Sequence, residues 1–197
     1  MSRPSLTASQ TVGPYFAIGL TQDDRPARLK HQLAGPNTTG QHIQIQGHVY
    51  DGDGAPVPDA MLELWQANGH GRYNHPADTR QGLPLDPDFT GFGRSGTDDE
   101  GRYWFQTIKP GRVPGADGGL QAPHIVVTVF ARGLLNHAVT RLYFGDEPSN
   151  ADDAVLQSVP AERRALLVAQ PHDHGTERAY QFDIVLQGDG ETPFFNV

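Results

Sequence analysis

The chain has 197 residues, enough for one sizeable domain, and 23 of them are glycine and 16 are proline. So much glycine and proline disfavours a helical bundle or coiled coil, because both residues interrupt helices and favour turns. The formal net charge of −8 argues against a nucleic-acid partner, and the absence of cysteine excludes disulfides and thiolate chemistry.

The first 40 residues are predicted to form an irregular arm. Prolines recur at Pro4, Pro14, Pro26 and Pro36, with little hydrophobic periodicity between them. No apolar run follows Arg3, so we expect no signal peptide and a cytoplasmic location.

From residue 41 the pattern is that of short strands. Ile43, Ile45 and Val49 alternate with polar residues, which is the period-2 signature of a half-buried strand. Proline at position 160 and the apolar residues after it predict one or two short helices within 149–170. We therefore predict an all-β domain over 41–197, a sandwich or barrel, and favour a two-sheet β-sandwich. The further predicted strands are 61–66, 103–108, 124–130, 140–144 and 180–187.

Two histidine pairs are weak candidates for a metal site. His172 and His174 would share one face of a strand, but Pro171 and Gly175 flank them and favour an exposed loop. His70 and His75 lie in a glycine-rich loop, where they could be ligands only with partners from elsewhere.

Three segments are similar to the core of the intradiol ring-cleaving dioxygenases. They are VYDGDGAPVPDAMLELWQANGHGRYNHP, FGRSGTDDEGRYWFQTIKPG and APHIVVTVFARG, and the resemblance runs from about residue 11 to the C-terminus. It implies a ferric ion between two β-sheets, bound by two tyrosinates and two histidines, at which dioxygen cleaves a catechol. Anionic oxygen ligands suit a hard cation such as Fe(III).

The resemblance places only half of that ligand set in this chain. Tyr73 and His124 match the first tyrosine and the first histidine. The positions of the second tyrosine and the second histidine are Val113 and Val126, and an arginine of the catalytic chains is replaced by Gln121. Valine has no lone pair to offer iron. We therefore expect Tyr73 and His124 to be remnants and this chain to bind no metal.

Within this family, one enzyme pairs an iron-free α chain with an iron-binding β chain. The segments SQTVGPYF, HAVTRLYF and GETPFF resemble the α chain. The resemblance implies a β partner that holds Fe(III), a higher αβ oligomer, and a substrate catechol that carries a carboxylate. It also implies that the arm packs on the partner and that Arg132, Thr11, Gly13, Pro14 and Tyr15 line the partner's substrate pocket.

Two other interpretations remain open. The segment GHVYDGDGAPVPDAMLEL also resembles carboxypeptidase-regulatory and transthyretin-like sandwiches, which would make the chain a non-catalytic binding module. A remodelled metal site, using His172, His174 or the His70 and His75 pair, would instead keep activity in this chain.

Overall fold

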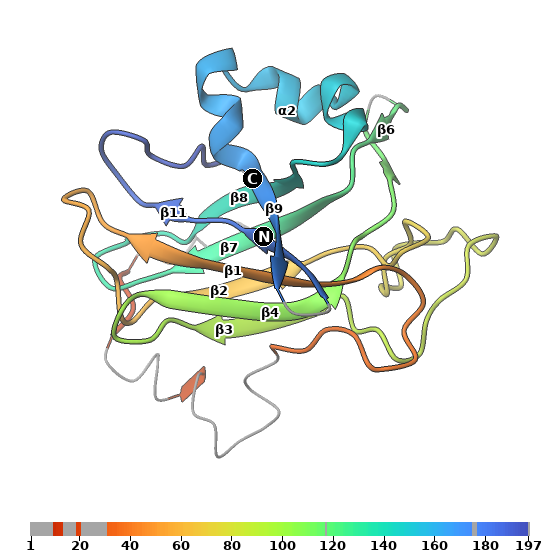
Figure 1. Cartoon of the computed structure of the whole chain (residues 1–197), viewed down its shortest axis with the longest axis horizontal. Coiled ribbons are helices and arrows are strands. Elements are labelled where there is room, and N and C mark those ends of the chain that lie inside the picture. Colours follow the sequence, from red (N-terminus) through yellow and green to blue (C-terminus); the bar gives the residue numbers. More distant parts are fainter. Residues whose placement is uncertain (1–9, 14–18, 21–30, 117, 175–176, 197) are drawn as a thin grey trace, which may run out of the picture.

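The structure is a computed structural model that describes residues 10–13, 19–20, 31–116, 118–174 and 177–196 (Figure 1). The side chains of residues 173–177 are not part of this description. Pro14 and Tyr15, two of the predicted substrate-binding residues, lie outside the described residues.

Most of the described chain is β-structure. Nine strands of this part form one sheet, and β5 (Val113–Pro114) pairs with β6 (Leu120–Gln121) in a separate hairpin. The strands of the large sheet are β1 (His42–Tyr50), β2 (Met61–Trp65), β3 (Phe92–Gly96), β4 (Arg102–Ile108), β7 (His124–Phe130), β8 (Ala138–Phe144), β9 (Val168–His174), β10 (Glu177–Gln181) and β11 (Ile184–Val185).

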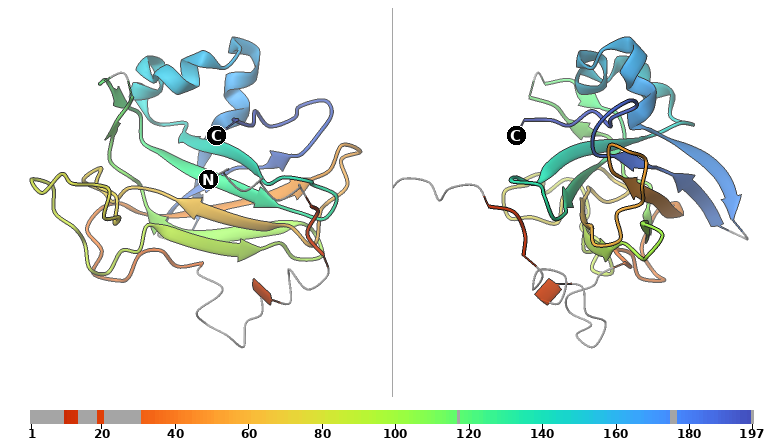
Figure 2. Two further views of the ribbon diagram at one scale, coloured as in Figure 1. Left: turned by 180° about the vertical axis from the view of Figure 1, so that it is seen from behind. Right: turned by 90° about the vertical axis from the view of Figure 1, so that its left-hand side faces the viewer.

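The sheet is barrel-like, and the predicted two-sheet sandwich is not confirmed. Its strands follow the order β11-β1-β10-β9-β8-β7-β2-β3, and β4 also pairs with β1. The two halves are joined where Tyr143 and Phe144 of β8 pair in parallel with Val168 and Ala169 of β9. Because of this link, hydrogen bonding runs continuously from one half to the other around the core (Figure 2).

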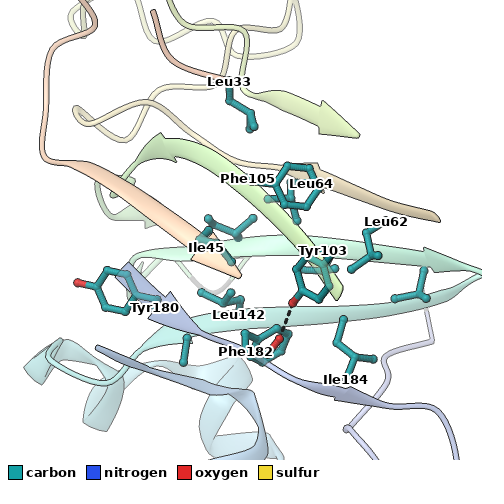
Figure 3. Close-up of a cluster of buried hydrophobic side chains, with 14 of the residues drawn as sticks. Leu33, Ile45, Leu62, Leu64, Tyr103, Phe105, Leu142, Tyr180, Phe182 and Ile184 are labelled. Carbon is teal, nitrogen blue, oxygen red and sulfur yellow. Dashed lines mark hydrogen bonds between the residues drawn. The ribbon is translucent and has the colours of Figure 1, made fainter. Parts of the chain in front are cut away.

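The core lies inside the curled sheet. Strand β1 alternates strictly between half-buried and buried residues, so Ile43, Ile45 and Val49 point inward as predicted. Leu62 of β2 and Phe105 of β4 meet them there (Figure 3). The core also contains Leu33, so residues 31–40 of the predicted arm pack in part on this chain itself.

Two predicted segments differ from the structure. The prediction of an exposed loop at His172 is wrong, because β9 runs through it and pairs His172 with Ala179 of β10. Pairing with β8 ends at Ala169, so Pro171 needs no N–H on that side and is tolerated there. The predicted strand 180–187 is split into the end of β10 and the short β11.

The prediction of short helices in 149–170 is confirmed, with three in place of the predicted one or two. They are the 3-10 helix η1 (Pro148–Asp152), the α-helix α2 (Ala154–Ser158) and the 3-10 helix η2 (Ala161–Leu167), which begins after Pro160. Leu156 of α2 and Leu167 of η2 pack in one cluster with Tyr143, which projects from the outer face of β8. No helix in the described part of the chain is long and apolar enough to span a bilayer.

Candidate functional site

A row of three side chains crosses the outer face of the sheet. Trp65 of β2 pairs with Val126 of β7, and Val126 pairs with Arg141 of β8. All three are half-buried, whereas their neighbours Leu64 and Val127 point into the core. The alternation of the strands thus brings these three residues together on the face away from the core.

Tyr73 is placed beside this row by the loop after β2. Its ring stacks on Trp65 with centroids 5.7 Å apart, and its backbone N–H donates to Asp78 Oδ2 at 2.8 Å. Hydrogen bonds from Arg80 hold the pKa of Asp78 well below its usual range and fix the loop. Burial raises the pKa of Tyr73, opposed in part by the positive charge of Arg141. Tyr73 lines a cavity of about 660 Å³, together with Trp65, His75, Val113 and Pro114.

His124 lies on the same outer face, two residues before Val126. Its side chain is buried, Nδ1 donates to the carbonyl of Ala122 at 2.8 Å, and its ring faces Tyr143 at 5.8 Å. Burial, followed by the charge of Arg141, lowers the pKa of His124 to about 4. The imidazole is therefore neutral at pH 7.

Arg141 is the functional candidate that sequence reasoning missed. Its Nη1 donates to Gln121 Oε1 at 2.5 Å and to the Tyr143 hydroxyl at 3.5 Å. No carboxylate of the described residues forms an ion pair with it. The sequence signal that could have pointed to it is an arginine inside the mostly apolar strand sequence VTRLYF.

The residues present do not fit a ferric ion. Of the four ligand positions that the resemblance predicts, this chain keeps one oxygen donor, Tyr73, and one nitrogen donor, His124. Val113 and Val126 stand at the other two ligand positions. Among the described residues, no group of three or more histidines, aspartates or glutamates is arranged to bind a metal. The donor set offers too few ligands for a hard cation, and a guanidinium lies beside it.

The burial of His124 makes the stability of the chain depend on pH. The unfolded chain takes up a proton near pH 6.5, whereas native His124 does so only near pH 4. Above about pH 6.5 the titration of His124 therefore costs no stability. As the pH drops from 6.5 toward 4, it lowers the free energy of unfolding by about 3 kcal/mol in total. Denaturant titrations from pH 7 to pH 4 should show this slope in the natural chain.

The same titrations of His124→Gln test the assignment. Glutamine does not titrate, so the part of the slope between pH 6.5 and 4 that comes from His124 should vanish. His70→Gln is the control, because His70 is exposed and its loss should leave the slope in place. An unchanged slope in His124→Gln would contradict the assignment.

A second candidate region lies at the other end of β7. Arg132 follows that strand, more than about 20 Å along it from His124 at the usual rise per residue. Its side chain is 72% exposed, and Nε contacts Asp59 Oδ2 at 3.2 Å. The backbone N–H of Gly133 donates to the hydroxyl of Thr11 at 2.8 Å. The structure thus brings Arg132 and the described arm residues together, away from Tyr73 and His124.

This region, which we call the arm patch, consists of residues 10–13 and 130–137. Thr11, Gly13 and Leu135 are exposed, and a cavity of about 330 Å³ opens between the arm and the turn after β7. A Cβ on Gly13 would meet nothing within 4 Å, so the described chain itself makes no use of the space that glycine leaves.

Comparison with known proteins decides the family. The family described as Dioxygenase matches residues 11–188, and the protocatechuate 3,4-dioxygenase alpha chain of Burkholderia cepacia is 48% identical over 201 residues, 97% of each chain. This chain belongs to the intradiol ring-cleavage dioxygenases. The predicted resemblance is therefore confirmed, and the comparisons give no support to a carboxypeptidase-regulatory or transthyretin-like module.

Two further dioxygenases, one known by sequence and one by structure, are also similar to most of this chain. The protocatechuate 3,4-dioxygenase beta chain of Burkholderia cepacia is 38% identical over 170 residues, covering 83% of this chain and 72% of that one. The dioxygenase domain of a carbohydrate-binding fusion from Streptomyces sp. SirexAA-E has a TM-score of 0.63 and 28% identity, covering 81% of this chain and 88% of that one.

Proposed function

We propose that this chain is the iron-free α subunit of a protocatechuate 3,4-dioxygenase. In this proposal it pairs with a β subunit that holds Fe(III), within a higher αβ oligomer. The complex cleaves protocatechuate between its two hydroxyls with O2 and yields 3-carboxy-cis,cis-muconate. The observation that carries the proposal is that valines stand at positions 113 and 126, where the resemblance places two ligands, in a chain similar to an alpha chain over almost its whole length.

The arm patch supports a role at the partner's substrate pocket. Arg132 is exposed, and its contact with Asp59 is a surface ion pair of a kind that contributes little to stability. Its guanidinium can therefore exchange Asp59 for a substrate carboxylate and form paired, charge-assisted hydrogen bonds. Thr11 accepts a hydrogen bond from Gly133, the residue after Arg132, and in this proposal Gly13, Pro14 and Tyr15 belong to the same lining.

Expression with and without a β partner tests the proposal. The chain alone should be colourless, hold no tightly bound iron and lack ring-cleaving activity. The coexpressed complex should contain one iron per αβ pair and cleave protocatechuate. One mole of tightly bound ferric iron per isolated chain would overturn the assignment, as would full activity of purified β without this chain.

Arg132→Ala in the αβ complex tests the substrate contact. We expect the KM for protocatechuate to rise about tenfold or more, because a charge-assisted hydrogen bond contributes roughly 1.5 to 3 kcal/mol. The KM for a catechol without the carboxylate should change much less. Steady-state kinetics on both substrates measure the difference.

Two matched variants separate recognition from a general loss of positive charge. Arg132→Lys keeps the charge and should recover part of the affinity for protocatechuate. Arg102→Ala removes an exposed arginine from β4 and should leave both KM values unchanged. Equal effects of Arg132→Ala on the two substrates would rule out carboxylate recognition.

A further inference from the structure

We infer that the guanidinium of Arg141 takes the electrostatic place of a metal ion in the remnant site and excludes cations from it. The loss of metal binding would then have two parts, the missing ligands and a resident positive charge. This inference rests on the proposed function, in which the iron of the complex belongs to the partner subunit.

The register of the sheet puts Arg141 next to the missing ligand. Val126 holds the position of the second histidine, and Arg141 is its direct cross-strand partner on β8. Directly opposed residues on one face have Cβ atoms about 5 Å apart. A metal bound by a side chain at position 126 would therefore lie next to the Arg141 side chain.

The charge of Arg141 acts on both remaining donors. Its positive charge opposes the rise in the pKa of Tyr73 and adds to the fall in the pKa of His124. A guanidinium does not lose its proton in proteins, so this charge is permanent. In a half-buried site, repulsion between two cations is screened far less than in water.

Among the described residues, uncharged groups hold Arg141 in place and none forms a direct ion pair with it. Gln121 and the Tyr143 hydroxyl accept its hydrogen bonds, and both are uncharged partners. The nearby carboxylate of Asp153 accepts instead from the Tyr143 hydroxyl, Ala122 N–H and Leu156 N–H. By the resemblance, catalytic chains carry an arginine at the position of Gln121. This chain has a neutral amide there, and its arginine stands instead on β8, directly opposite the position of the missing histidine.

Restoring the missing ligands, with and without the charge, tests the inference. The first variant of the full chain is Val113→Tyr with Val126→His, which completes a set of two tyrosines and two histidines. Further variants add Arg141→Gln, Arg141→Lys or the control Arg102→Gln. Each is titrated with Fe(III) supplied as its citrate complex, and binding is followed by iron content after desalting and by the visible absorption of tyrosinate-bound Fe(III).

We expect Arg141→Gln to tighten Fe(III) binding by about tenfold or more over the ligand-restored variant. Arg141→Lys and Arg102→Gln should bring no such gain, because the first keeps the local charge and the second removes a distant one. Equal affinity with and without Arg141 would overturn the inference. Tight binding of iron by the natural chain would instead overturn the proposed function.

A smaller change covers the case in which the larger tyrosine side chain prevents folding. Val126→His alone creates a two-histidine pair with His124 on one strand face, and Zn²⁺ is the probe. Val126→His with Arg141→Gln should bind Zn²⁺ about tenfold or more tightly than Val126→His alone. Circular dichroism confirms folding of each variant, and equal zinc affinities would refute the role of Arg141.

Discussion

Replacing Asp153 with alanine should destabilise this chain by about 4 kcal/mol, since three donors lose one buried acceptor. The Asp153 carboxylate is fully buried and accepts from Ala122 N–H at 2.7 Å, Leu156 N–H at 2.8 Å and the Tyr143 hydroxyl at 2.9 Å. It therefore caps α2 and ties it both to the segment just before β7 and to the outer face of β8. Urea unfolding measures the loss.

Two variants show whether the hydrogen bonds account for this effect. Asp153→Asn keeps one acceptor oxygen and should lose less stability than Asp153→Ala. Asp152→Ala removes the exposed neighbouring carboxylate and should change the free energy of unfolding by less than about 0.5 kcal/mol. Similar losses for Asp152→Ala and Asp153→Ala would contradict the assignment. Because Ala122 immediately follows Gln121, Asp153→Ala should also loosen the contact between Gln121 and Arg141.

The strands and their inward-facing residues are predicted best from the sequence where one face of a strand is buried. The prediction of a strand over 124–130 is confirmed at both ends by β7, and the inward residues of β1 are the predicted ones. In such strands the alternation of apolar and polar residues carries the information locally. The resemblance in turn singled out Tyr73 and His124, and the fold places both next to the row through Val126.

Long-range pairings could not be read from that alternation. The parallel contact of Phe144 with Ala169 turns a predicted sandwich into one continuous sheet, and no local pattern encodes which strands become neighbours. The importance of Arg141 likewise depends on its register against Val126. The short strand β3 was missed because its sequence, FGRSG, is rich in small residues and lacks apolar alternation.

Gly47→Ala should destabilise the chain at least as much as Asp153→Ala, lowering the free energy of unfolding by about 4 kcal/mol or more. A Cβ at position 47 would lie 1.8 Å from the carbonyl oxygen of Phe182, far inside contact distance. That oxygen also accepts the hydrogen bond of the Tyr103 hydroxyl, drawn as a dashed line in Figure 3. The backbone at Phe182 would have to move away, and the Tyr103 hydrogen bond would be lost inside the core. Thermal and urea unfolding of the full chain measure the change.

The same close approach explains why the predicted strand 180–187 is divided. Strand β1 pairs with β10 through Gln46 and with β11 from Val49, and between these two pairings the backbone of Phe182 lies against Gly47. Gly82→Ala is the matched control, because a Cβ there meets nothing within 4 Å, and it should leave stability nearly unchanged. If Gly47→Ala were as stable as Gly82→Ala, the close approach of Phe182 could not depend on a missing side chain. Glycine inside an otherwise regular strand pattern is thus the sequence signal for this close approach.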